Sequence, residues 1–118
     1  MDAKKGYRAL SKNLPMSPSK IRPIANHLRR KSYTDAVAIL DALPQKGAGY
    51  LKKAIQSAAA NAMHQDQNLD EESLFVAELL VDGGPSRTTI WPRSHGRADR
   101  QIKRSSHIHV VLNLKAVE

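Results

Sequence analysis

The chain has 118 residues, of which 41% are hydrophobic, and its 19 Lys and Arg against 11 Asp and Glu give a formal net charge of +8. This length suits one domain with one modest core, and the positive charge favours a polyanion such as nucleic acid, or an anionic membrane surface, as partner. Because the chain has no Cys, disulfide frameworks, thiolate nucleophiles, Fe–S clusters and Cys-based zinc sites are excluded. No segment approaches the ~18 apolar residues of a membrane span, and the charged start does not resemble a secretory signal, so we expect a cytoplasmic protein.

The charge is concentrated in two blocks. Residues 1–31 hold 9 Lys and Arg against 1 acid, residues 32–85 hold 3 against 8, and residues 86–106 hold 6 against 1. Two basic blocks that flank an acidic middle indicate an extended contact surface. The alternative is a basic tail at each end, which the periodic apolar residues within both blocks disfavour.

The first 31 residues predict a strand and a helix. Residues 5–14 alternate loosely and predict an edge strand. Ser17-Pro18 predicts a helix start, with Ser17 as N-cap and Pro18 at the first helical position. Pro23 would remove an internal hydrogen bond, so either the regular helix begins nearer Lys20 or it is kinked.

Helical spacing gives this first helix two distinct faces. The buried face is formed by Ile21, Ile24, Ala25 and Leu28. A second face carries Arg22, Asn26, Arg29 and Arg30, and is either a phosphate-binding stripe or a solvated surface.

The middle of the chain predicts two further helices. The first spans Asp35 to Ala42 with Ser32 or Thr34 as its cap, and a turn follows at residues 45–49. The second spans Tyr50 to His64. Its buried stripe is formed by Leu51, Ile55, Ala58 and Ala62, while Asn61 and His64 lie on a different face.

The last third predicts two strands separated by a basic segment. Residues 65–73 are polar and read as a loop. The apolar run 74–81 predicts a strand, and strict alternation predicts another at 107–114. We expect the core to receive Phe75, Ala77, Leu79 and Val81 from the first strand and Ile108, Val110, Leu112 and Leu114 from the second.

The segment 82–106 is either a long flexible loop or a continuation of both strands into an antiparallel ribbon. Structureless loops beyond about 12–15 residues are uncommon in compact domains, which favours the ribbon. Pairing residue 74 with residue 112 puts its turn near residue 93, and each arm would reach ~60 Å. A two-stranded ribbon is marginal alone in water, so this basic ribbon needs a polyanionic partner.

Four stretches resemble a known family, the large-subunit ribosomal proteins numbered twenty-two. They are Ser17 to Arg22, Ser57 to His64, Gly84-Pro85-Ser86, and Pro92 to Arg100 continuing through Lys103-Arg104-Ser105-Ser106-His107-Ile108. The resemblance covers about residues 7–114. Its most specific part is the last stretch, in which Gly96-Arg97-Ala98-Asp99 is followed by Lys103-Arg104, then Ser106-His107-Ile108 and a strand. Two departures are Arg30, where the family customarily has Gly, and His95, where Lys is common.

The resemblance implies an α+β fold in which three helices pack on a small antiparallel three-stranded sheet, and two strands extend into a long β-hairpin. We expect a single domain, with a body at about 5–82 and 105–115 and the hairpin at about 83–104. The family is a structural part of the large ribosomal subunit. It binds large-subunit ribosomal RNA, contacts neighbouring ribosomal proteins, bridges RNA domains during assembly and lines the peptide exit tunnel with its hairpin tip. It requires no cofactor, and no homo-oligomer is expected.

We therefore predict an RNA-binding surface that includes both basic blocks and a few polar residues outside them. Its candidates are Ser17, Lys20, Arg22, Arg29, Arg30, Lys31, Asn61, His64, Arg87, Trp91, Arg93, Arg97, Arg100, Lys103, Arg104 and His107. Arg can fork onto phosphate oxygens or stack on a base, and Trp91 either stacks on RNA or packs on the other strand of the hairpin. Asn61 and His64 bind RNA or cap their helix. The tunnel-lining tip would be Arg93, Ser94, His95 and Gly96.

Other functions have weaker support. His107 and His109 share a strand face, but two histidines without a third ligand are weak grounds for a metal site. Ser94, His95 and Asp99 lack the oxyanion hole and orienting shell of a hydrolase, so we expect no enzyme. The remaining alternative is a free-standing basic RNA-binding regulatory protein.

Overall fold

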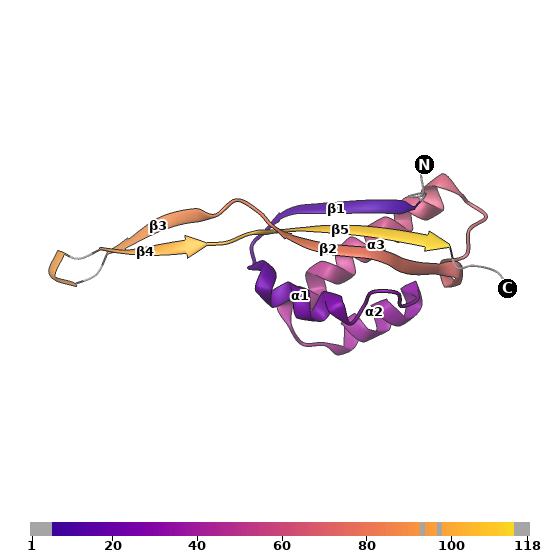
Figure 1. Cartoon of the computed structure of the whole chain (residues 1–118), viewed down its shortest axis with the longest axis horizontal. Helices are drawn as coiled ribbons and strands as arrows, with labels where there is room; N and C mark the ends of the chain where they lie inside the picture. Colours follow the sequence, from indigo (N-terminus) through magenta and orange to yellow (C-terminus); the bar gives the residue numbers. More distant parts are fainter. Residues whose placement is uncertain (1–5, 93, 97, 115–118) are drawn as a thin grey trace.

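The computed structural model describes residues 6–92, 94–96 and 98–114. Within them the chain forms two antiparallel sheets, with strand orders β1-β5-β2 and β3-β4, and three α-helices (Figure 1). In chain order the elements are β1 Tyr7–Leu14, α1 Pro18–Asn26, α2 Tyr33–Ala42, α3 Lys46–Gln65, a 3-10 turn Glu71–Ser73, β2 Leu74–Gly83, β3 Arg87–Pro92, a 3-10 turn Ser94–Gly96, β4 Ala98–Lys103 and β5 Ser106–Leu114. The predicted α+β fold is confirmed.

The molecule has two visibly different parts. The helices cover one face of the three-stranded sheet and form the body, while β3 and β4 project from one end of the body as an arm (Figure 1). The principal extents are 69 × 32 × 21 Å, so the long axis is set by the arm. The ribbon predicted for residues 82–106 is present, and the flexible-loop alternative is wrong.

The core lies between the sheet and the helices. On β5 the buried side chains are Ser106, Ile108, Val110 and Leu112, in strict alternation. They face Leu51, Ile55 and other apolar residues of the helices. The expected inward placement of Ile108, Val110 and Leu112 is therefore confirmed, whereas Leu114 is 44% exposed.

One half of the predicted core face of β2 is wrong. Leu79 and Val81 are fully or nearly fully buried as expected, but Leu74 and Val76 are buried in place of Phe75 and Ala77. The cause is a register shift between Val76 and Glu78. An extra residue in one strand reverses which side chains point inward, so simple alternation fails across it.

The same register places the end of the hairpin two residues later than predicted. Leu74 pairs with Leu114, and Pro92 pairs with Ala98. The turn is therefore centred on His95 rather than on residue 93. His95 has φ of 62° and Gly96 has φ of 75°, and this left-handed pair reverses the chain.

The helix α1 begins at Pro18 and continues through Pro23, so the alternative start near Lys20 is wrong. The hydrogen bond that Pro23 cannot make would have gone to the carbonyl of Ser19. Ser19 is exposed, so water can satisfy that group. Ser17 is the N-cap, as predicted, and accepts from the backbone N–H of Ser19 at 3.3 Å. Ser32, not Thr34, caps α2 by accepting from the N–H of Asp35 at 3.3 Å.

The helix α3 begins at Lys46, four residues before the predicted start, so the turn predicted at residues 45–49 is wrong. Gly47 is buried there, and a Cβ built on it would lie 3.4 Å from the Sδ of Met16 and from the Cδ1 of Ile24. Close packing against α1 thus outweighs the low helix propensity of glycine. The sequence reveals the low helix propensity of glycine but not this packing contact.

Candidate nucleic-acid interface

The arm joins the body at a short double connection, which we call the neck and define as residues 84–86 and 104–105. The two chain segments are tied directly, because the N–H of Gly84 donates to the carbonyl of Ser105 at 2.9 Å and the Ser105 hydroxyl donates to the carbonyl of Pro85 at 2.7 Å. A Cβ on Gly84 would lie 2.5 Å from the Ser105 hydroxyl and 3.0 Å from the His107 ring. Only glycine allows the segments to approach so closely.

Residues of β1 and β5 brace the neck from the body. Asn13 has φ of 58° at an irregularity in β1, and its N–H donates to Nδ1 of His107 at 3.1 Å. The buried Ser106 hydroxyl bonds the carbonyl of Met16. The predicted RNA ligand His107 therefore uses one ring nitrogen as an acceptor within the body, which fixes its ring and leaves Nε2 as the nitrogen able to face a ligand.

Two hollows flank the neck and share Pro15, Lys103 and Arg104. The first, about 530 Å³, is also lined by Asn13, Pro85, Ser86, Arg87 and Ser105. The second, about 540 Å³, is also lined by Met16, Ser17, Lys20, Lys46 and Ile102. Together these described linings hold five cationic residues and no Asp or Glu.

The helices orient their positive ends toward the second hollow. Ser17 is the N-cap of α1, Lys46 is the first residue of α3, and both line it. Unsatisfied N–H groups and the helix dipole favour anions at such ends. Four predicted contacts thus come together in this hollow: Ser17 and Lys20 from the body, Lys103 from the arm and Arg104 from the neck. Lys46 was missed, because the sequence placed it in a turn of the acidic middle.

The three arginines near α1 cover the open edge of the sheet. Nε of Arg22 donates to the carbonyl of Val81 at 3.0 Å, Nε of Arg29 donates to the carbonyl of Leu79 at 3.0 Å, and the N–H of Arg30 donates to the carbonyl of Val76 at 2.9 Å. Each protects an edge group that could pair with another chain. All three residues are exposed, so they combine this task with a positive surface.

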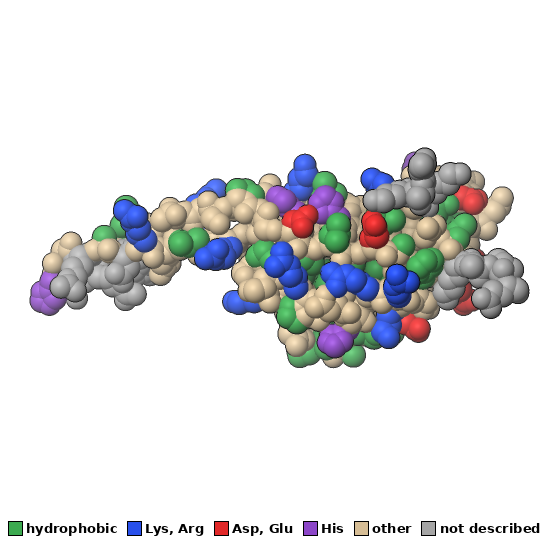
Figure 2. All heavy atoms as spheres, viewed as in Figure 1, with side chains coloured by type: hydrophobic (Ala, Val, Ile, Leu, Met, Phe, Trp, Pro, Cys, Tyr) green, Lys and Arg blue, Asp and Glu red, His purple; other side chains and the backbone are tan. Residues whose placement is uncertain are grey.

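Figure 2 shows the consequence as a row of Lys and Arg side chains between β2 and the α1–α2 layer. Arg29 also bonds the side chain of Asn26. Because α1 ends at Asn26, Arg29 and Arg30 lie in the turn that follows, and the predicted helical face shared by all four residues is wrong. The carbonyl of Lys31 accepts from the N–H of Val76 at 2.8 Å. A shallow hollow of about 540 Å³ on this side is lined by Asn26, His27, Arg29, Lys31, Ile39 and Leu43.

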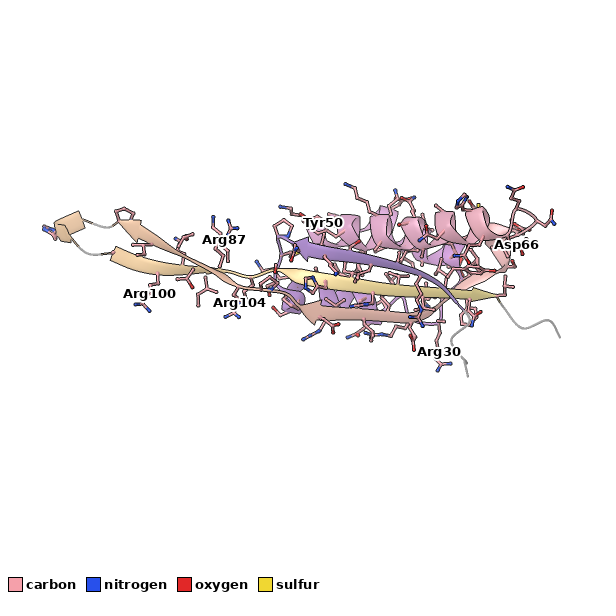
Figure 3. All side chains as sticks on the ribbon, turned by 90° about the horizontal axis from the view of Figure 1, so that it is seen from above. Arg30, Tyr50, Asp66, Arg87, Arg100 and Arg104 are labelled. Carbon is pink, nitrogen blue, oxygen red and sulfur yellow. The ribbon has the colours of Figure 1, made fainter. Side chains whose placement is uncertain are left out.

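Asn61 and His64 do not meet the other candidates. The Asn61 amide donates to the carbonyl of Arg8 on β1 at 2.8 Å, so it covers the opposite edge of the same sheet. It does not cap α3, whose C-cap is Asp66. His64 is exposed in the last turn of α3, and Figure 3 shows Asp66 at the end of the body far from the neck.

The arm presents its described charges on both sides. Arg87 pairs with Lys103, Arg100 pairs with Ile90, and all three cations are exposed. Figure 3 shows Arg87 on one side of the arm and Arg100 and Arg104 on the other. Of the other predicted contacts, Arg93 and Arg97 lie outside the described residues, as do the side chains of Trp91 and Ser94.

The two strand histidines take different partners within the body. His109 lies with Nε2 3.5 Å from a carboxylate oxygen of Asp82, while His107 bonds the backbone of Asn13. Across residues 6–92, 94–96 and 98–114, no three His, Cys, Asp or Glu side chains gather as metal ligands would. Over the same part of the chain, no helix has the length and hydropathy needed to cross a membrane.

The chain is similar in sequence to known proteins. The family described as "Ribosomal protein L22p/L17e" matches residues 9–113. Large ribosomal subunit protein uL22 of Borrelia recurrentis is 54% identical over 110 residues, which are 93% of this chain and 92% of that protein. The uL22 protein of Borrelia hermsii is 55% identical over 104 residues, which are 88% of this chain and 87% of that protein. The uL22 protein of Borreliella afzelii is 50% identical over 109 residues, which are 92% of this chain and 91% of that protein. The chain therefore belongs to the ribosomal protein L22p/L17e family, whose members are structural components of the ribosome and not enzymes.

Proposed function

We propose that this ribosomal protein, a structural constituent of the large subunit in the cytoplasmic ribosome, binds large-subunit ribosomal RNA through its neck and arm. The observation that carries the proposal is the pair of hollows at the neck, with five cations and no acid among their described linings. Neutralising phosphates with Lys and Arg releases counterions, which supplies a large share of the affinity of a protein for nucleic acid. The relatives named above are proteins of the same subunit.

In the mechanism we propose, the body and the arm have different tasks in RNA binding. The neck and the α1 side of the body hold the phosphate backbone, while the arm enters RNA that the body cannot reach. Since the body and the arm then touch different RNA segments, one chain can hold distant segments together during assembly, beside neighbouring ribosomal proteins. The tip at residues 94–96, the most distant part of the arm, would line the exit tunnel beside the nascent peptide.

The first test neutralises the two cations that both neck hollows share. K103Q with R104Q should weaken binding to large-subunit RNA. The fall of log affinity with log salt should become shallower, by about one unit of slope for each lost phosphate contact. K52Q with K53Q removes the same charge from α3, where neither residue lines a neck hollow, and should leave the slope unchanged. Equal losses in the two double variants would show that net charge, and not the neck, governs binding.

The second test separates the arm from the body. A variant lacking residues 88–98 keeps the neck, and we expect it to fold, bind the RNA and enter large subunits. The full chain should stay in stoichiometric amount with large subunits through a high-salt wash. Release of the full chain would favour a free-standing RNA-binding regulator instead, and failure of the deletion variant to enter subunits would contradict the division of tasks.

The third test concerns the tip. A photo-crosslinking amino acid at His95 should form adducts with the nascent peptide of stalled ribosomes, while the same group at the exposed Glu72 of the body should not. The absence of adducts from His95 would contradict the tunnel position without affecting the RNA-binding proposal.

A further inference from the structure

The arm has two chemically different faces. In an antiparallel pair, directly opposed side chains lie on the same face and successive pairs alternate. The pairs Thr88–Ile102, Ile90–Arg100 and Pro92–Ala98 therefore share one face, which we call the apolar arm face, while Arg87–Lys103 and Thr89–Gln101 share the other. Arg100 is the one charged residue in the three pairs of the apolar arm face.

The apolar arm face is unusually open to solvent. The side chain of Ile90 is 70% exposed and that of Ile102 is 56% exposed. They are diagonal neighbours, because Ile90 lies two residues along β3 from the partner of Ile102. A two-stranded ribbon has no second layer to cover them, so an external partner is needed to remove this surface from water.

The apolar arm face continues directly into the basic neck. Ile102 lines the same hollow as Ser17, Lys20 and Lys46, together with Lys103 and Arg104. A partner seated on these cations would therefore also touch Ile102. The segment 86–106 holds 6 Lys and Arg against 1 acid, so the surroundings favour a polyanion over a protein with an ordinary surface.

We infer that the apolar arm face packs against the bases and riboses of unpaired RNA, and that this contact adds affinity that salt does not screen. The inference rests on the proposed RNA-binding function. Unpaired nucleotides expose flat apolar faces and single-stranded RNA binders use them in this way. Arg100, on the same face, can stack its guanidinium on a base or bind a phosphate.

The test measures the affinity for large-subunit RNA over a series of salt concentrations. I90T with I102T keeps two β-branched residues in the strands and removes the apolar side chains. L10T with L80T is the matched control, because Leu10 is 47% and Leu80 is 49% exposed on the body. We expect the arm variant to bind about tenfold or more weakly at every salt concentration with an unchanged slope, and the control to bind like the wild type.

Three other results are distinguishable. Wild-type binding by the arm variant at all salt concentrations would overturn the inference and leave the proposed function intact. Wild-type RNA binding combined with poor retention in the large subunit would replace RNA with a protein as occupant of this face, and would overturn the inference too. Failure of the wild type itself to bind the RNA would overturn the proposed function. Thermal unfolding of the arm variant, which should match the wild type, excludes misfolding as the cause.

Discussion

The body and the arm are built from the same kind of strand pairing, yet different forces hold them. In β5 of the body, every core-facing side chain from Ser106 to Leu112 is buried, whereas on β3 and β4 none of the described side chains is buried. Hydrophobic stabilisation scales with the apolar area removed from water. The body is therefore stabilised by its own core, whereas the arm depends on an external partner for its stability.

The largest contrast should come from two isoleucines on strands that follow each other in the chain but belong to different sheets. Ile108 on β5 is fully buried, and Ile102 on β4 is 56% exposed. I108A should lower the free energy of unfolding by ~2–5 kcal/mol because it leaves a cavity, while I102A should change it by less than about 0.5 kcal/mol. Urea unfolding of the free protein measures both. Similar losses for the two variants would mean that the arm is part of the cooperative fold.

The neck should be the next most sensitive place. In G84A the new methyl group would collide with the Ser105 hydroxyl and the His107 ring, and overpacking of this kind costs ~1–3 kcal/mol. G49A is the matched control, because its Cβ meets nothing within 4 Å in α3, and it should stabilise the chain by about 0.5–1 kcal/mol. The midpoint of thermal unfolding should fall in G84A and rise in G49A. An unchanged midpoint in G84A would show that the neck can rearrange to accommodate the methyl group.

Arg30 offers a smaller effect within the body. Its φ of 68° lies in the left-handed region, which disfavours a residue with a Cβ by about 1–2 kcal/mol. R30G relieves this strain, whereas R30A removes the same charged side chain and keeps the strain. R30G should therefore unfold at a higher temperature than R30A. The reverse order would contradict the conformational explanation for the glycine that the family customarily has here.

The smallest effect concerns pH and should be confined to the body. Burial raises the pKa of the Tyr33 phenol, with a further increase from Glu71 opposed by Lys52. The unfolded chain then ionises first, so the contribution of Tyr33 to stability is complete below the ordinary pKa near 10 and is lost as the pH rises through the higher folded value. Y33F should show a weaker decline of the unfolding free energy above pH 10 than the wild type, and an equal decline would contradict the assignment.

The elements that were predictable are those whose signal is local. Alternation located β5, the Ser17-Pro18 pair located the start of α1, and charge with spacing indicated the ribbon. The errors came from tertiary effects. The bulge near Ala77 reversed the expected inward face of β2, and packing of Gly47 on α1 extended α3 by a turn. Neither has a signature in the residues themselves.

The candidate interface shows the same limit. Lys20, Lys103 and Arg104 were expected from charge, and the fold brings them to one neck. The edge-covering hydrogen bonds of Arg22 and Asn61 were not expected, because the edges of a sheet are known only once its strand order is known. Lys46 joined the site through the position of a helix start, which composition does not reveal.

The most direct test of the difference between body and arm is amide hydrogen exchange of the chain, first free and then bound to large-subunit ribosomal RNA. Exchange reports how often each hydrogen bond opens. We predict that the amides of β5 are strongly protected in both states, while those of β3 and β4 exchange rapidly in the free chain and become protected on binding. Protection of the free arm equal to that of β5 would contradict the account, since the arm would then be stable without a partner.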